Sequence, residues 1–193
     1  MNPLILNVLI ALATFPLTAC GQPTVEQAPP PVEAEAPPAV VETVPATETD
    51  PAELLRNGKL PAEGVLTGGQ PTPEQFKTLA DLGYGTVVNL RTPGEKDNTD
   101  PALIESLGMR YVSLPIGGAE TLNEQNARKL AEILGDAETP VVVHCASGNR
   151  VGGLLALKAY YVDENTPEEA LAFGREAGMT RIEPLITQKL GLE

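Results

Sequence analysis

The first basic side chain in this sequence is Arg56, and this uneven distribution of charge limits which part of the chain can fold. Residues 21–53 carry seven acidic side chains and eight prolines, and they contain no Lys or Arg. Such a segment repels itself and cannot bury an apolar core, so we expect a disordered tether over residues 21–54, with or without a function of its own. The remaining residues, 55–193, suffice for one domain of ordinary size.

An apolar run over residues 3–19 precedes the tether and contains no charged side chain. It is too short and too interrupted by proline to span a membrane comfortably, so it is typical of a signal peptide, here residues 1–20. Its end, Leu17-Thr18-Ala19-Cys20, resembles the lipobox of bacterial lipoproteins, in which the cysteine becomes the acylated N-terminus. The resemblance implies an exported protein, anchored to a bacterial membrane through lipid on Cys20 and facing the periplasm or the cell exterior. An ordinary secreted or buried apolar helix with an incidental cysteine is the alternative.

The charge and the histidine content exclude several classes of function. The chain has 13 basic and 26 acidic residues, and the part from residue 55 onward is itself acidic. A protein that neutralises nucleic-acid phosphates needs a basic face, so we expect no nucleic-acid partner. His144 is the only histidine, which excludes a His-rich metal site, and we expect neither a metal nor a cofactor.

Short runs of β-branched residues alternate with stretches of helical periodicity in the second part of the chain. The runs lie at residues 65–67, 86–90, 110–116 and 140–145. This alternation favours an α/β fold with a central, largely parallel sheet flanked by helices. The expected helix starts are Thr72 before Pro73 and the capping boxes Thr121/Glu124 and Thr166/Glu169. The segment 151–162 is apolar almost all round, as expected for a helix in the centre of a domain.

The last β-branched run leads directly into the most informative motif, VVVHCASGNR at residues 141–150. Cys145 follows the strand, a loop of small residues comes next, and Arg150 opens a helix. The backbone N–H groups of such a loop and the helix N-terminus converge on a bound oxyanion, and an arginine adds two parallel hydrogen bonds. The same field stabilises a thiolate at Cys145, the one thiol that remains once Cys20 is assigned to the anchor. The expected phosphate-binding loop consists of Ala146, Ser147, Gly148, Asn149 and Arg150.

His144 directly precedes the cysteine on the strand. Neighbouring strand residues point to opposite faces of a sheet, so His144 cannot act as a base in contact with Cys145. We expect a buried, hydrogen-bonded side chain that orders the loop from behind. The alternative for the whole motif is a structural cysteine at a strand end, followed by an ordinary turn with Gly and Asn.

Four segments together resemble a known family. They are GGQPTPEQF at 68–76, VVNLR at 87–91, YVSLPI at 111–116 and HCASGNR at 144–150. Over nearly all of residues 60–180 the chain resembles the DUF442 family, a phosphatase-like domain that also occurs fused to β-lactamase-like hydrolases and belongs to the protein tyrosine phosphatase superfamily. The resemblance implies a dual-specificity-phosphatase-like fold in which Cys145 is the nucleophile and Arg150 binds phosphate. It implies hydrolysis of a phosphate monoester, on a phosphorylated small molecule or a phosphoprotein, through a cysteinyl-phosphate intermediate.

The sequence departs from the usual phosphatase pattern at three places. Only four residues separate Cys145 from Arg150, one fewer than the pattern has, and Val151 stands where a hydroxyl residue usually follows the arginine. The loop after YVSLPI, which carries an aspartate as general acid in such phosphatases, reads GGAET and offers only Glu120. Further candidates for the acid are Asp97 and Asp100 in the stretch TPGEKDNTDP, unless that stretch is simply a solvated run of charges.

Two other functions use the same residues. The spacing Cys145-x-x-Gly148-x-Arg150 also resembles the rhodanese loop, where the thiolate accepts sulfur as a persulfide. Against this alternative, rhodaneses continue after the loop helix with a further strand, whereas this chain continues with helical patterns. The third candidate is a module that binds an oxyanion or a partner without turnover. A weak acid within reach of the leaving group distinguishes a phosphatase from such a module.

Overall fold

The computed structural model describes residues 49–192, which contain a five-stranded sheet with the order β1-β2-β5-β3-β4. The strands are β1 (Lys59–Ala62), β2 (Val65–Gly68), β3 (Thr86–Asn89), β4 (Arg110–Ser113) and β5 (Val141–His144). β5 pairs in parallel with β2 and β3, and β3 with β4, whereas β1 pairs antiparallel with β2. The expected α/β fold with a largely parallel sheet is confirmed. β1 was not predicted, because its residues are mostly exposed and include a proline.

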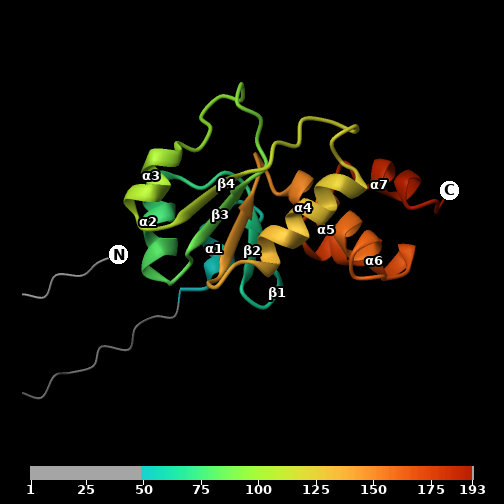
Figure 1. Cartoon of the computed structure of the whole chain (residues 1–193), viewed down its shortest axis with the longest axis horizontal. Helices are drawn as coiled ribbons and strands as arrows, with labels where there is room; N and C mark the ends of the chain where they lie inside the picture. The colour runs from blue at the N-terminus through green and yellow to red at the C-terminus, as the bar shows by residue number, and fades with distance from the viewer. Residues whose placement is uncertain (1–48, 193) are drawn as a thin grey trace, which may run out of the picture. The chain divides into compact units, whose positions relative to one another are not determined.

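Helices lie on both sides of this sheet. They are α1 (Pro51–Leu54), α2 (Pro73–Asp81), α3 (Pro101–Ser106), α4 (Glu124–Gly135), α5 (Asn149–Tyr161), α6 (Pro167–Glu176) and α7 (Glu183–Lys189). Figure 1 shows α2 and α3 on one side of the sheet and α4, α5, α6 and α7 on the other. Neighbouring parallel strands require such helical crossover connections, because the chain must return to the edge of the sheet where the first strand began before it starts the next. Within residues 49–192, no helix is both long and apolar enough to cross a bilayer.

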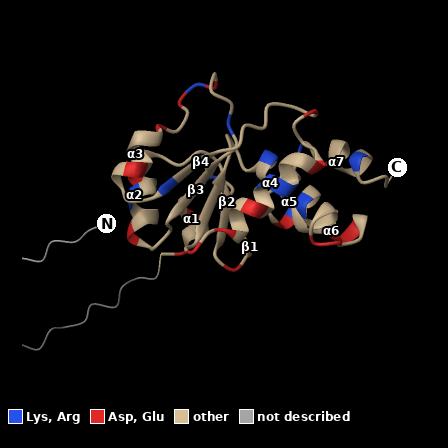
Figure 2. Cartoon of the chain, viewed as in Figure 1, with Lys and Arg blue, Asp and Glu red and all other residues tan. Residues whose placement is uncertain are grey.

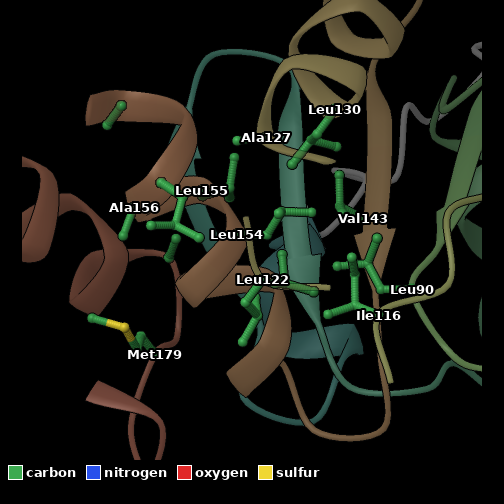
Figure 3. Close-up of a cluster of buried hydrophobic side chains, with 14 of the residues drawn as sticks. Leu90, Ile116, Leu122, Ala127, Leu130, Val143, Leu154, Leu155, Ala156 and Met179 are labelled. Atoms are coloured by element: carbon green, nitrogen blue, oxygen red, sulfur yellow. The ribbon is translucent and has the colours of Figure 1, made fainter. Parts of the chain in front are cut away.

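The larger of two hydrophobic clusters lies between the sheet and helices α4 to α7. Figure 3 shows its centre, where Val143 of β5 lies near Leu130 of α4 and Leu154 of α5. α5 is buried over most of its length, in agreement with its uniformly apolar sequence. Gly152 permits this burial, because a Cβ at that position would lie 2.2 Å from the backbone nitrogen of Met179. α5 is therefore fixed in the core, and its first turn lies at the end of β5.

Two of the three expected N-caps are confirmed. Thr72 and Thr166 both form capping boxes with the residue three positions later. The expected capping box of Thr121 with Glu124 is wrong, because α4 begins at Glu124 and Asn123 caps it. The Thr121 hydroxyl instead accepts hydrogen bonds from two N–H groups of the preceding loop, at 3.0 and 3.1 Å. Thr121 thus shapes the loop between β4 and α4.

The folded part begins earlier than the sequence indicated. Residues 51–54, which we assigned to the tether, form α1, and the Asp50 side chain caps this helix. Ala52 and Leu54 pack against the smaller hydrophobic cluster, to which buried Leu55 belongs. The prolines and acidic residues around them masked these apolar positions in the sequence. The expected signal peptide, Cys20 and most of the expected tether lie outside the described residues.

The parallel strands β2, β3, β4 and β5 all end at the same edge of the sheet. The loops that follow β3, β4 and β5 therefore emerge on one side of the domain, as Figure 1 shows. Open α/β sheets bind their ligands outside the carboxyl ends of the strands. The motif at Cys145 lies at this edge.

Candidate active site

Cys145 directly follows the last residue of β5, and only 1% of its surface is exposed. Its Sγ accepts a hydrogen bond from the backbone N–H of Gly148 at 3.2 Å. Gly148 has a left-handed backbone (φ = 84°), which turns the loop into the first residue of α5. Glycine adopts this conformation without the steric strain that a side chain would bring. The loop therefore curls around the sulfur atom, and the N-cap residue of α5 donates to it.

Contacts within the protein hold the expected phosphate-binding loop from outside. The Asn57 side chain donates to the Ser147 carbonyl at 3.1 Å. Asn149 is buried, and its side-chain oxygen accepts a hydrogen bond from the N–H of Thr180 at 2.8 Å. The Asn149 side chain is thus engaged by the segment before α7, which leaves its backbone for an anion. Ala146 is exposed at the rim of the loop.

The Arg150 guanidinium is held at one end. Nη1 and Nη2 donate to the two carboxylate oxygens of Glu95 at 2.7 and 2.8 Å, and Nη1 also donates to the Ile116 carbonyl at 2.8 Å. These contacts use three of the five N–H donors of an arginine. The contacts with Glu95 and Ile116 leave Nε–H and one Nη2–H, which form the side edge of the guanidinium, and the side chain of Cys145 lies within interaction distance of Arg150. This edge is a parallel pair of donors that matches two oxygens of a phosphate.

Glu95 was not identified from the sequence, yet it lies at the centre of this site. Besides Arg150, the side chain of Arg91 donates to it at 3.1 Å and the N–H of Thr92 at 2.8 Å. The hydrogen bond from Arg150 is the main reason that the pKa of Glu95 lies well below its usual value, against the opposing effect of burial. The carboxylate is therefore ionised near neutral pH. The available sequence signal was Arg91, because a basic residue at the end of a buried strand needs an acidic partner nearby.

The three candidate acids have different surroundings. Asp97 lies on the loop after β3, where acidic and basic residues are close together (Figure 2), and 80% of its side chain is exposed. Asp100 is the N-cap of α3 and accepts a hydrogen bond from the helix backbone at 3.0 Å, so its carboxylate serves that helix. Glu120 is exposed on the loop after β4, and its carboxylate has no hydrogen-bond donor in the described part of the chain. The contact of Arg150 with the Ile116 carbonyl ties the start of this loop to the site.

His144 is fully buried and lies against Phe76 of α2, with ring centroids 5.8 Å apart. Phe76 and Cys145 belong to different hydrophobic clusters, so the histidine and the thiol face opposite sides of the sheet. Nε2 lies 3.2 Å from the Thr99 hydroxyl, and Nδ1 has no partner within residues 49–192. Burial lowers the pKa of His144 to about 3. The imidazole is therefore neutral at physiological pH and is not placed to accept a proton from the thiol.

Comparison with protein families gives one match over most of the chain. The family model described as "DSP-PTPase phosphatase fused to NAD+ Kinase" matches residues 41–185. A β-lactamase hydrolase-like protein of Xylella fastidiosa is 29% identical over 121 residues, which cover 60% of this chain and 28% of that protein. The chain thus matches little more than a quarter of the length of this curated relative.

Solved structures share the fold. A DUF442 protein from Shewanella putrefaciens has a TM-score of 0.52 at 22% identity, and the match covers 70% of this chain and 90% of that chain. The core catalytic domain of the PP-IP phosphatase SIW14 from S. cerevisiae has a TM-score of 0.54 at 16% identity, with 72% and 85% covered. At these identities the likeness establishes the fold alone.

We predict that His144 stays neutral well below the pH at which an exposed histidine is protonated. Because it is the only histidine, one set of imidazole signals in NMR spectra of the untagged protein reports it, and His144→Gln identifies that set. The signals should keep their chemical shifts from about pH 8 to about pH 5, because the pKa in the folded state is about 3. A titration midpoint near the ordinary value of about 6.5 would show a solvated histidine and contradict this packing.

Proposed function

The chain belongs to the family described as DSP-PTPase phosphatase fused to NAD+ kinase, in the protein tyrosine phosphatase superfamily. We propose that it hydrolyses a phosphate monoester through a cysteinyl-phosphate intermediate. The observation that carries the proposal is the unused edge of Arg150 at the N-terminus of α5, in the same loop as the buried thiol of Cys145. A pair of parallel donors, a loop of backbone N–H groups and a sulfur nucleophile together suit attack at phosphorus.

Two displacements at phosphorus complete the proposed reaction. In the first, the Cys145 thiolate attacks phosphorus, an S–P bond forms, and the bond to the ester oxygen breaks while that oxygen takes a proton from an acid. In the second, water attacks phosphorus and gives a proton to the carboxylate that the acid became in the first step, the S–P bond breaks, and phosphate leaves while Cys145 returns to a thiolate. Arg150 and the loop N–H groups hold the other phosphate oxygens and stabilise the charge of both transition states.

Glu120 is our candidate for the acid, because its loop is tied to Arg150 through the Ile116 carbonyl. Asp97 is the second candidate, since it shares a loop with Glu95. Asp100 is a weaker candidate than either, because its carboxylate already caps α3. A poor leaving group such as an alkoxide needs the acid, whereas an aryl oxide departs without it.

The proposed substrate is a phosphorylated small molecule or a phosphoprotein. The acidic net charge of −13 argues against a nucleic acid. Sulfur transfer is the second candidate function, because Gly148 turns the loop in the Cys-x-x-Gly-x-Arg spacing and the Glu120 carboxylate has no hydrogen bond within residues 49–192 that would fix it as an acid. A persulfide at Cys145 requires no proton donor. Both functions place the reacting sulfur in the same loop.

Assays of the full-length protein on an aryl phosphate, an alkyl phosphate and thiosulfate with cyanide test this proposal. We expect hydrolysis of the aryl phosphate, reduced to background by Cys145→Ser. Glu120→Gln should slow alkyl phosphate turnover by ~10²-fold or more and aryl phosphate turnover much less, because only the alkoxide needs a proton. Arg150→Lys should slow both, because a point charge does not replace the donor pair.

Asp97→Asn serves as the comparison variant for the acid. If it abolishes alkyl turnover while Glu120→Gln does not, the acid is Asp97. Turnover of thiosulfate without hydrolysis of either phosphate would replace the proposal by sulfur transfer. No turnover of any substrate, with phosphate still bound, would leave an anion-binding module.

The N-terminal sequence supports a second proposal, that the protein is exported and held at a membrane by lipid on Cys20. The support is the lipobox-like sequence Leu17-Thr18-Ala19-Cys20 after an uncharged apolar run. Acyl chains attached there would anchor the chain without a transmembrane helix in the mature protein.

Expression in a Gram-negative host checks the anchor. The wild-type chain is expected in the membrane fraction and Cys20→Ala in the soluble fraction, because the variant lacks the acylated residue. The substitution lies outside residues 49–192, so both forms should show the same specific activity. Equal release of the two forms into the soluble fraction would contradict the anchor.

A further inference from the structure

Arg91 and Glu95 lie behind Arg150 as two successive contacts. Glu95 holds the end of the Arg150 guanidinium with both carboxylate oxygens, at 2.7 and 2.8 Å. Arg91 is only 7% exposed, and its Nε donates to the same carboxylate at 3.1 Å. The side chains of Arg91, Glu95 and Arg150 therefore form a network of charge-assisted hydrogen bonds that ends at the phosphate-binding loop.

Arg91 also folds the loop that carries Glu95. Its Nη1 donates to the Asp97 carbonyl and to the Gln70 side-chain oxygen, both at 2.9 Å, and its Nη2 donates to the Lys96 carbonyl. Asp97 has a left-handed backbone (φ = 53°), which is uncommon for a residue with a side chain. The bond from Arg91 stabilises this conformation and so fixes the position of Glu95.

We propose that Arg91 and Glu95 are positioning residues, which hold the Arg150 guanidinium so that its Nε–H and free Nη2–H face the phosphate. The inference rests on the proposed function in one respect, the assignment of Arg150 to phosphate binding. A free arginine side chain samples many orientations, and most of that freedom would be lost when phosphate binds. Because Glu95 holds one end of the Arg150 guanidinium, its orientation is set when the protein folds. Phosphate then binds to a donor pair that is already oriented.

A purely electrostatic view makes the opposite prediction for Glu95. A carboxylate near an anion site repels the bound anion, so its removal should tighten phosphate binding. Positioning predicts that removal weakens binding, because the donor pair loses its orientation. Two guanidinium groups share the charge of Glu95, which reduces the repulsion that phosphate feels. The sign of the change in phosphate affinity therefore separates the two views.

The test measures binding of inorganic phosphate to full-length Cys145→Ser protein by calorimetry, which needs no turnover. Adding Glu95→Gln keeps the size of the side chain but removes its charge, and it should weaken phosphate binding about tenfold. Glu124→Gln is the matched control, because Glu124 pairs with Arg128 at 2.7 Å on the exposed face of α4, and it should leave the affinity unchanged. Unchanged or tighter binding in Glu95→Gln would overturn the proposal.

Arg91→Lys is a second variant, and it keeps every charge of the site. The Arg91 guanidinium donates to four acceptors, on Glu95, Gln70, Lys96 and Asp97. A lysine has only three donors, all on one nitrogen, so it cannot replace these contacts, and phosphate binding should weaken by about threefold or more. An electrostatic role for Arg91 predicts no change. If the Arg91→Lys variant binds phosphate as tightly as the Cys145→Ser protein without it, the positioning role of Arg91 is wrong.

A double variant shows whether Glu95 acts through Arg150. In an Arg150→Lys background no donor pair remains to be positioned, so Glu95→Gln should change phosphate affinity by less than about twofold. An equal loss in both backgrounds would indicate a general structural effect and overturn the proposal. Failure of the proposed function would look different, because phosphate would bind with these dependences while neither phosphate ester was hydrolysed.

Discussion

Glu95 and Arg150 meet where the loops after β3, β4 and β5 come together. Glu95 belongs to the first loop, Arg150 follows the third loop in the first turn of α5, and the same guanidinium reaches the Ile116 carbonyl of the second. Their side chains are 25% and 20% exposed, so leaving either charge without its partner costs roughly 1–3 kcal/mol. That is a considerable part of the ~5–15 kcal/mol by which a domain is stable. One ion pair thus joins the three loops, and it uses the end of the Arg150 guanidinium rather than its Nε edge.

The sheet separates the surroundings of two neighbouring residues. Cys145 faces the loop and receives the N–H of Gly148, whereas His144 is buried on the other face with Phe76 and Thr99. A neutral, buried histidine supports the end of β5 without taking a proton from the thiol. The backbone N–H groups of the loop and Arg150 therefore make the site suitable for an anion, and both are in place before a ligand binds. A loop that is ordered in advance loses little entropy when it binds an anion.

The parts of the site that could be predicted from the sequence have local signals. The run of valines, Gly148 and Arg150 lie within ten residues, and their order specifies strand, turn and helix. Glu95 had only one local signal, Arg91 four positions earlier, and a carboxylate between Gly94 and Lys96 looks solvated in sequence. Its main partner, Arg150, is 55 positions away. The cap of α4 was missed for a similar reason. Thr121 and Asn123 are both good caps, and the choice between them depends on two loop N–H groups that bind the Thr121 hydroxyl.

The central claim is that Cys145 carries the phosphoryl group during turnover. The most direct measurement is mass spectrometry of the full-length protein after it is mixed with an aryl phosphate, quenched in acid and digested. We expect a phosphoryl group on the peptide that contains Cys145, and none on the corresponding peptide of Cys145→Ser. A phosphoryl group on another residue, or a sulfur atom on Cys145 after thiosulfate with no phosphoryl group after the phosphate ester, would contradict it.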